Sequence, residues 1–191
     1  MARWQPGVRD RLVLAAVDLF TEQGYDGTTV AQIAERAGTT RSTFFRHFPD
    51  KRELLVAGQE TLSRLLAAGI ADAPAEASPM DAVAAGLARA ATMMGPMNRD
   101  LGPRLKAAVA ASSELQERDA LKRVGMAAAM SAALVGRGVP TPTAEVAAEL
   151  GVLAFKQAYA AWSEGPVGDD DFGPYTQAAL RQLLAATENL R

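Results

Sequence analysis

Residues 29–48 read TVAQIAERAGTTRSTFFRHF, and this stretch holds the most informative pattern of the chain. From Val30 onward, apolar residues recur at positions i, i+3, i+4 and i+7, which is the spacing of one face of an α-helix. Thr29 is a favourable N-cap, because its hydroxyl can accept a hydrogen bond from a free N–H group of the first turn. Gly38 is a favourable stop. The pattern predicts a helix over 30–37.

A second, shorter helix is expected over 41–47, since Pro49 cannot continue it. Phe44 and Phe48 are four residues apart and fall on one face, where they can pack on the preceding helices. Two short helices joined by a tight turn at Gly38 are the pattern of a helix-turn-helix. The second helix is then the one that a DNA major groove admits.

The outer face of this second helix carries the side chains that would meet DNA: Arg41, Ser42, Phe45 and Arg46. Short hydroxyl side chains near the helix N-terminus can approach phosphates or base edges without a steric cost, and three are present: Thr40, Ser42 and Thr43. Arg41 suits either a bidentate contact to guanine or a phosphate contact, and we favour the phosphate.

Positive charge is concentrated in the same region. The whole chain has a formal net charge of −2, whereas residues 36–52 hold five basic residues and one acidic residue, a net charge of +4. The distribution indicates a local basic patch and not a polybasic tract.

Helical periodicity runs through the rest of the 191 residues, and no stretch alternates at period two as a β-strand does. Glycine and proline residues divide the chain into about nine helical segments. Their expected ranges are 8–23, 30–37, 41–47, 51–70, 80–94, 98–112, 115–136, 143–163 and 174–190. The sequence therefore predicts an all-α fold.

The composition excludes several chemistries. The chain has no cysteine and a single histidine, His47, so it lacks the residues of disulfide frameworks, thiolate zinc sites and the common histidine clusters. A phosphate loop and a nucleophile with its base are also missing, and we expect no enzyme activity, no metal and no cofactor.

We expect no membrane span. The longest nearly uncharged apolar stretch, 125–136, is shorter than the about 20 residues that a span needs. Arg9, Asp10 and Arg11 stand where a signal peptide would be apolar, so a cytoplasmic location is expected.

Residues across about 8–55 carry a family resemblance. They are Phe20, Gly24-Tyr25, Thr28-Thr29-Val30, Ile33-Ala34, Ala37-Gly38, Thr43 to Phe48, and Lys51 with Leu54-Leu55. This set resembles the N-terminal signature of TetR-family transcriptional regulators. The resemblance implies a homodimer with a three-helix DNA-binding domain over 1–52 and a larger helical domain over 53–191 that binds a small effector and dimerises. It also implies repression at a near-palindromic operator on double-stranded DNA, relieved by the effector.

The family's DNA-contacting positions, as the resemblance implies them, fall on Thr29, Thr40, Arg41, Ser42, Thr43, Phe45, Arg46, His47 and Lys51. Two of these positions depart from the family pattern. Tyrosine is usual where this chain has Phe45, and the missing hydroxyl leaves an apolar contact such as one to a thymine methyl group. Glycine is frequent where this chain has Ser42.

The helix expected over 143–163 carries two apolar stripes, one of large and one of small residues. The small stripe permits close approach of another helix and suits a four-helix dimer interface with the last segment. The predicted interface residues are Ala147, Gly151, Ala154, Ala158, Ala161, Leu180, Leu183 and Leu184. The alternative is burial of this stripe inside a larger bundle of one chain.

Methionines are frequent in the middle helices, and such adaptable side chains can line a pocket for varied apolar ligands. The predicted effector residues are Met93, Met94, Met97, Met126, Met130, Phe155, Tyr159 and Trp162. An apolar or aromatic effector would suit them, and ordinary core packing is the alternative.

The charged run over 114–123 is expected to be a solvated helix face. Glu114 with Arg118 and Asp119 with Arg123 are spaced for i,i+4 ion pairs. The fourth helix is expected to begin at Lys51, and together with the middle helices it is expected to link the two domains mechanically.

Two functions remain open from the sequence. The first is a DNA-binding regulator, either a repressor or an activator. The second is a helical ligand-binding or partner-binding module whose helix-turn-helix segment serves only packing or a protein contact.

Overall fold

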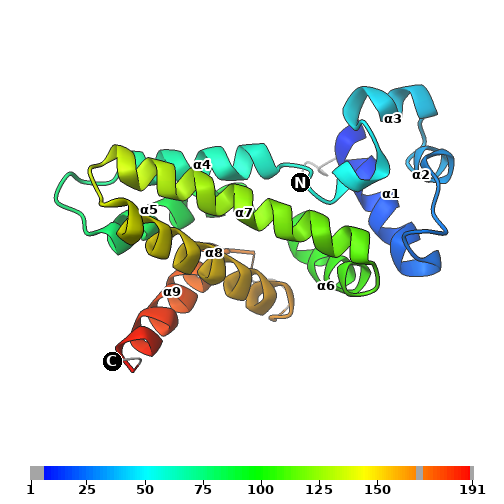
Figure 1. The fold of residues 1–191 in the computed structure, drawn as a ribbon. Helices are drawn as coiled ribbons and strands as arrows, with labels where there is room; N and C mark the ends of the chain where they lie inside the picture. Colours follow the sequence, from blue (N-terminus) through cyan, green and yellow to red (C-terminus); the bar gives the residue numbers. More distant parts are fainter. Residues whose placement is uncertain (1–6, 167–169, 190–191) are drawn as a thin grey trace, which may run out of the picture. The chain divides into compact units, whose positions relative to one another are not determined.

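The computed structural model describes residues 7–166 and 170–189. Over these residues the chain forms nine α-helices, one short 3-10 helix and no strand, which confirms the all-α prediction (Figure 1). The helices are α1 (Val8–Gln23), α2 (Val30–Arg36), α3 (Arg41–His47), η1 (Lys51–Leu54), α4 (Gln59–Ala71), α5 (Pro79–Ala91), α6 (Pro96–Ala110), α7 (Ser113–Gly136), α8 (Thr141–Ser163) and α9 (Gly173–Glu188). Among the described residues, none of these helices is long and apolar enough to cross a membrane.

The fourth helix does not begin at Lys51, and the prediction of one helix over 51–70 is wrong. The side chain of Asp50 accepts hydrogen bonds from the N–H groups of Arg52 (2.7 Å) and Glu53 (3.2 Å), which caps the short η1 helix. Gly58 then takes a left-handed conformation with φ of 84°, which an α-helix cannot contain. The apolar pattern continued through this break, so periodicity alone did not show it.

Contacts divide the chain into two compact units. The first contains the residues up to Ala57 together with 103–120, and the second contains 58–102 together with the residues from 121 onward. Helices α6 and α7 therefore each contribute to both units. The predicted domain boundary between residues 52 and 53 stays a prediction, because a grouping of contacts does not test which segment folds by itself.

The core of the first unit is built around α3. Phe44 and Phe48 are almost completely buried, as their spacing predicts. They pack with apolar residues of α1, α2, η1, α6 and α7, among them Leu12, Leu19, Phe20, Ile33, Leu54, Leu55, Ala108 and Leu115. The orientation of α3 is thus fixed by burial of one face, which leaves the opposite face to solvent.

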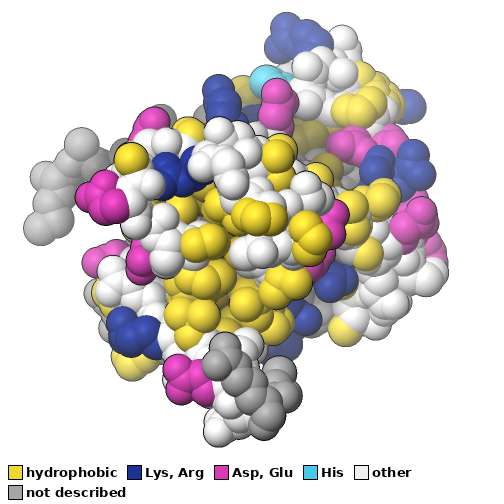
Figure 2. Space-filling model, turned by 60° about the vertical axis from the view of Figure 1, so that its left-hand side comes forward, with side chains coloured by type: hydrophobic (Ala, Val, Ile, Leu, Met, Phe, Trp, Pro, Cys, Tyr) yellow, Lys and Arg dark blue, Asp and Glu magenta, His cyan; other side chains and the backbone are white. Residues whose placement is uncertain are grey.

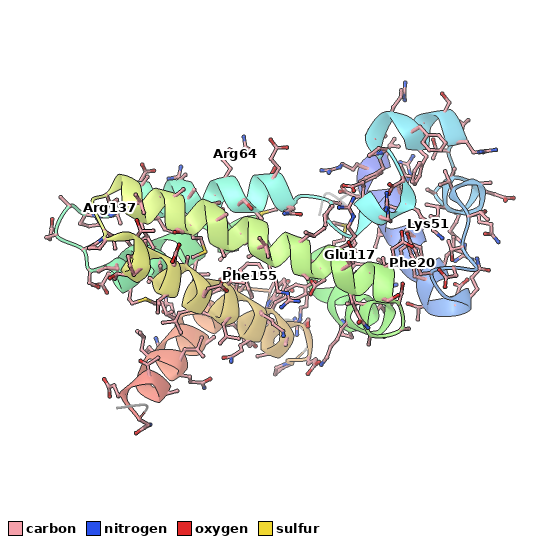
Figure 3. The ribbon with its side chains drawn as sticks, viewed as in Figure 1. Phe20, Lys51, Arg64, Glu117, Arg137 and Phe155 are labelled. Carbon is pink, nitrogen blue, oxygen red and sulfur yellow. The ribbon has the colours of Figure 1, made fainter. Side chains whose placement is uncertain are left out.

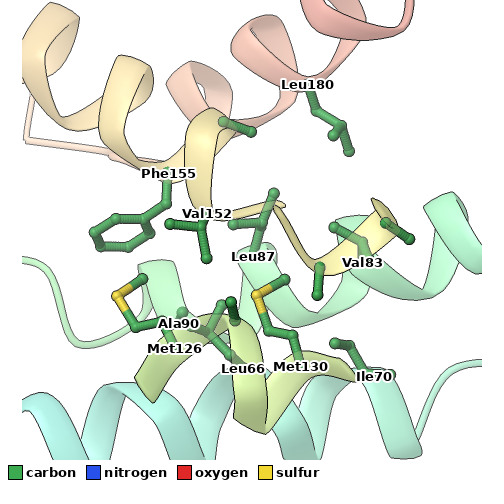
Figure 4. Packing of buried hydrophobic residues seen from close by; sticks show 14 of the residues in the cluster. Leu66, Ile70, Val83, Leu87, Ala90, Met126, Met130, Val152, Phe155 and Leu180 are labelled. Atoms are coloured by element: carbon green, nitrogen blue, oxygen red, sulfur yellow. The ribbon is translucent and has the colours of Figure 1, made fainter. Parts of the chain in front are cut away.

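The core of the second unit collects the large side chains of α4, α5, α7, α8 and α9. Figure 4 shows Met126 and Met130 of α7 beside Leu66, Leu87 and Val152. At one end of α7, the Arg137 guanidinium donates hydrogen bonds to the carbonyl oxygens of Ala71, Ala73 and Pro74, at the end of α4 (Figure 3).

The small-residue stripe of α8 faces the core of the second unit. Ala147, Gly151, Ala154 and Ala158 are each buried within the single chain, and a Cβ on Gly151 would collide with Met130 and Val83. This is the packing of the alternative given above, burial of the stripe inside the bundle of one chain, because small side chains let α8 approach its own neighbours closely; a dimer interface at these residues stays a prediction. Of the other predicted interface residues, Leu180 is also buried, Leu183 and Leu184 are half-buried against the same core, and Ala161 is exposed.

Helices α4 and α5 cross at two glycines. A Cβ built on Gly86 would lie 2.8 Å from the carbonyl oxygen of Leu66 and 2.9 Å from Cγ1 of Ile70. A Cβ on Gly69 would lie 2.7 Å from the carbonyl oxygen of Ala85. Since backbone atoms cannot give way as a flexible side chain can, this crossing requires glycine at both positions.

Gly86→Ala is expected to lower the free energy of unfolding by about 2–3 kcal/mol through this overpacking, measured by urea denaturation. Gly125→Ala on α7 is the matched control, because its Cβ would meet only the end of the Gln59 side chain, at 2.7 Å. There the better helix propensity of alanine should leave stability unchanged or raise it by up to about 1 kcal/mol. Equal effects at the two positions would contradict the close crossing.

Candidate nucleic-acid interface

The turn between α2 and α3 is a Schellman motif. The N–H of Thr39 donates to the carbonyl of Ala34 (2.9 Å), and the N–H of Gly38 donates to the carbonyl of Glu35 (3.0 Å). Gly38 has a φ of 64°, which a residue with a Cβ adopts only at a cost. The predicted stop of α2 is confirmed.

Both short helices are capped by threonine. The Thr29 hydroxyl accepts from the N–H of Gln32 (3.3 Å), and the Gln32 side chain accepts from the N–H of Thr29 (2.8 Å), which is a capping box. At α3, the Thr40 hydroxyl accepts from the N–H of Thr43 (3.1 Å) and lies 3.0 Å from the Thr43 hydroxyl. The predicted cap at Thr29 is confirmed. The hydroxyls of Thr40 and Thr43 stabilise the first turn of α3.

The outer face of α3 is open to solvent. Phe45 is 50% exposed, although the neighbouring Phe44 is fully buried. The other exposed side chains of α3 are those of Arg41, Ser42, Arg46 and His47. The structure thus places the predicted DNA-contacting residues Arg41, Ser42, Phe45 and Arg46 together on the exposed side of α3.

Two of the basic residues around α3 are neutralised locally. Arg36 forms a two-pronged ion pair with Glu22, with N–O distances of 2.8 and 2.9 Å, and Arg52 pairs with Asp50 at 2.7 Å. The hydrogen bonds from the arginine side chains lower the pKa of the Glu22 and Asp50 carboxyls below their usual values. Asp50 is already counted in the net charge of +4 for 36–52, so only the Arg36–Glu22 pair offsets part of that charge.

Arg41 and Arg46 keep their charge. Neither guanidinium lies within ion-pair distance of a carboxylate in the part of the chain that the structure describes, and both side chains are exposed. Among the described residues, the basic side chains of 36–52 without a carboxylate partner are therefore Arg41 and Arg46 on α3 and Lys51 in η1. Exposed, unpaired arginines on a presented helix are suited to phosphates and to guanine edges.

Lys51 is held inside the unit. Its ammonium donates to the carbonyl oxygens of Tyr25 (2.8 Å) and Thr28 (3.0 Å), and it lies 3.9 Å from the centre of the Tyr25 ring (Figure 3). An ammonium has three donors, so one remains. A phosphate contact by Lys51 stays a prediction, and its first role is to hold the turn before α2.

Sequence reasoning missed two residues of the first unit. Glu114 accepts a hydrogen bond from the Tyr25 hydroxyl (2.9 Å), and Arg118 forms an ion pair with Glu53. The expected pair of Glu114 with Arg118 on a solvated face is wrong. The apolar Leu115 between them, fully buried in the core of the first unit, was the available signal that this end of α7 is packed.

The predicted effector residues lie in the second unit. Met126, Met130, Phe155 and Trp162 are buried, whereas Met93, Met94 and Met97 are partly buried near the junction of α5 and α6. The Tyr159 hydroxyl donates to the carbonyl of Asn98 (2.6 Å), and burial raises the pKa of Tyr159 to about 12. Their role in effector binding stays a prediction, and core packing accounts for the buried members.

Three helices with a tight α2–α3 turn and an exposed, arginine-bearing α3 define a helix-turn-helix protein. Residues 12–57 match the family described as bacterial regulatory proteins, tetR family. The chain is 39% identical to the HTH-type transcriptional regulator TcmR of Streptomyces glaucescens over 75 residues. The aligned part makes up 39% of this chain and 33% of TcmR. It is 38% identical over 68 residues to the HTH-type transcriptional repressor AcnR of Corynebacterium diphtheriae. The aligned part makes up 36% of this chain and 34% of AcnR.

Solved structures extend the similarity of fold over about nine tenths of the chain. A protein described as a TetR-family transcriptional regulator from Syntrophomonas wolfei has a TM-score of 0.59 at 17% identity and covers 92% of each chain. The transcriptional regulator FadR from Bacillus subtilis, solved with stearoyl-CoA, has a TM-score of 0.57 at 16% identity and covers 91% of this chain and 96% of FadR.

Residues 12–57 are thus similar to the N-terminal part of TetR-family regulators, and the described residues share the fold of the solved proteins, in agreement with the resemblance drawn from the sequence. The sequence matches span about one third of the length of these curated relatives. The printed names of both relatives describe transcriptional regulators.

Proposed function

We propose that this chain is a dimeric, sequence-specific DNA-binding transcriptional repressor in which α3 enters the major groove. The observation that carries the proposal is the pair Arg41 and Arg46, exposed and without a carboxylate partner among the described residues, on a helix whose opposite face is buried. A repressor works where the DNA lies, so the cytoplasmic location predicted from the sequence belongs to the same proposal.

Roles within α3 follow from the exposed atoms. Arg41 and Arg46 contact phosphates or guanine edges, and Ser42 contacts a base edge or a phosphate. Phe45 presents only carbon to the groove, which suits a thymine methyl group. The remaining predicted contacts, those of Thr29, Thr40, Thr43, His47 and Lys51, position the unit on the DNA backbone.

The dimer forms through the outward faces of α8 and α9. Val146 and Leu153 of α8 are 62% and 39% exposed, and Leu183 and Leu184 of α9 are half-buried. Figure 2 shows hydrophobic side chains gathered into one continuous area on the face that it presents. Apolar surface of this kind marks protein contacts. These residues take the place of the buried small residues of α8 in the predicted interface.

Release from DNA follows binding of a small apolar or aromatic effector in the second unit. The adaptable methionines and the aromatic residues of α7 and α8 supply apolar contacts, with FadR and its stearoyl-CoA as a precedent in the same fold. The effector stabilises a state that binds the operator less well. The free-energy difference between the two states changes by as much as the effector's binding free energies to them differ.

Selection of bound fragments from random duplex DNA tests the proposal. The purified chain is expected to enrich a near-palindromic site whose half-sites lie about one helical turn apart, because two copies present two α3 helices. Failure to enrich any sequence, with only weak salt-sensitive binding, would overturn sequence-specific binding and favour the helical ligand-binding or partner-binding module.

A further inference from the structure

One charged side chain lies inside the second unit. Arg99 of α6 is 6% exposed, and no other charged residue in the described parts of the chain is buried. Removing a guanidinium from water costs free energy unless hydrogen bonds and opposite charge replace the lost hydration. The groups around Arg99 therefore indicate what this position is suited to bind.

Carbonyl oxygens hold one side of the guanidinium. Nη2 of Arg99 donates to the carbonyl oxygens of Gly165 (2.9 Å) and Pro166, just beyond Ser163, the last residue of α8. The carbonyl end of a helix carries partial negative charge, which favours a cation there. These contacts fix the orientation of the planar group, but carbonyl dipoles do not neutralise its full charge.

A carboxylate lies beside the same guanidinium. Oδ1 of Asp170 is 3.7 Å from Nη1 of Arg99, and the Asp170 side chain is 60% exposed, compared with 8% for that of Arg99. Hydrogen-bonded ion pairs have shorter N–O distances, about 2.7–2.9 Å, and an exposed partner contributes little free energy. The position next to Nη1 is thus one that a carboxylate occupies and that is reached from solvent. A ligand carboxylate can take the place of Asp170 there.

Aromatic rings adjoin the guanidinium. Asn98, the residue before Arg99, accepts a hydrogen bond from the Tyr159 hydroxyl (2.6 Å). A Cβ built on Gly165 would lie 2.9 Å from the Tyr175 hydroxyl oxygen, so Tyr175 lies beside the carbonyl that Arg99 binds. Both tyrosines are half-buried, and Tyr159 belongs to a cluster of four rings, those of Phe155, Tyr159, Trp162 and Phe172. An apolar ligand body would find aromatic surface beside the charge.

We propose that Arg99 is the anion-binding residue of the effector site and that the effector is a carboxylic acid with an apolar or aromatic body. Its carboxylate pairs with the Arg99 guanidinium in place of Asp170, and its body lies against Tyr159 and Tyr175. The proposal rests on the effector-regulated function proposed above and names the chemical class of that effector. A buried charge beside apolar side chains orients a ligand and rejects its uncharged analogues.

Matched acids and amides test the proposal without DNA. The probes are octanoate and 4-phenylbutyrate, each compared with its primary amide, which has nearly the same shape and no charge. At least one acid is expected to raise the midpoint of thermal unfolding of the full chain, because it binds the folded state. The corresponding amide should bind at least about 10-fold more weakly, since a hydrogen bond between charged groups contributes more than one to a neutral group.

Asp170→Asn separates a ligand site from a structural contact. The substitution removes the competing carboxylate and keeps the size of the side chain, so the acids should bind about 3-fold or more tightly. If Arg99 only fastened the end of α8, acid binding would not respond to this substitution. Asp171→Asn is the matched control, because the exposed Asp171 accepts from the N–H of Gly173 (2.9 Å). It should change acid affinity by less than about 1.5-fold, through screened long-range charge alone.

Arg99→Lys tests the guanidinium itself. Lysine keeps the positive charge but lacks the planar fork that pairs with both oxygens of a carboxylate. The substitution should weaken acid binding about 10-fold or more and leave amide binding unchanged. If this variant does not fold, the acid–amide pairs with Asp170→Asn and Asp171→Asn decide. The proposal is overturned if no acid binds the unmodified chain or Asp170→Asn, if acids and amides bind equally, or if the two asparagine variants behave alike.

Operator binding distinguishes this proposal from the proposed function. The bound acid is expected to weaken binding to the selected duplex about 5-fold or more, within the usual range of coupling between sites. If the chain selects no duplex but acids bind through Arg99, the DNA-binding function fails and the carboxylate site stands. If a duplex is selected and no acid binds, the function stands and the carboxylate site fails. An acid that binds through Arg99 without changing DNA affinity would overturn its assignment as the effector.

Discussion

Arg41→Ala combined with Arg46→Ala is expected to weaken binding to the selected operator by about 100-fold or more. Each guanidinium is exposed and without a carboxylate partner among the described residues, so each can contact DNA. One such contact contributes roughly 1–3 kcal/mol to the free energy of binding. If both contact phosphates, the slope of log affinity against log salt should also fall by about 2. Fluorescence anisotropy at several salt concentrations measures both quantities.

The matched control removes the same charge elsewhere. Arg64→Ala with Arg89→Ala takes two exposed arginines from the second unit, where Arg89 forms only a surface ion pair with Asp72. Such pairs contribute little to stability, and the DNA affinity should change less than about threefold. If the control weakens binding as much as the α3 variant, net charge and not α3 would account for the affinity.

Phe44→Ala is expected to lower the free energy of unfolding by about 3–5 kcal/mol, because Phe44 is fully buried and its ring packs against Phe48 and Phe45. The neighbouring Phe45→Ala should change stability by less than about 1 kcal/mol, since half of that side chain is in solvent. Urea denaturation compares the two variants directly.

For DNA affinity we expect the reverse of the order found for stability, with Phe45 as the residue that matters. Phe45→Ala removes the apolar contact proposed for a thymine methyl group and should weaken operator binding by roughly fivefold, about 1 kcal/mol. Replacement of thymine by uracil in the duplex should weaken binding of the unmodified chain by a similar factor and should change binding of the variant little. A Phe45→Ala variant that binds as tightly as the unmodified chain would remove Phe45 from the interface.

The helix-turn-helix was predictable because its signals are local. The cap at Thr29, the stop at Gly38 and the block at Pro49 act within a few residues, and each lies where the structure has a helix end. The burial of Phe44 and Phe48 and the exposure of Phe45 followed from helical periodicity alone.

The features that the sequence did not resolve share a different origin, because they concern partners far apart in the chain. The small residues around Gly151 pack on Val83 and Met130, and Glu114 contacts Tyr25 across 89 residues of sequence. A pattern of small or charged residues shows that a face is packed or paired but not with which element. The break before α4 was missed because Gly58 interrupts the helix without interrupting the apolar spacing.

Binding to the selected duplex, compared with a shuffled duplex of the same length and composition, is the direct test of whether α3 recognises a DNA sequence. Titrations of both at the same near-physiological salt concentration are expected to show at least about a 1,000-fold preference for the selected sequence. They should also show two chains bound per duplex, since the half-sites are related by a two-fold axis. Equal affinity for the two duplexes would contradict the account that α3 recognises a DNA sequence.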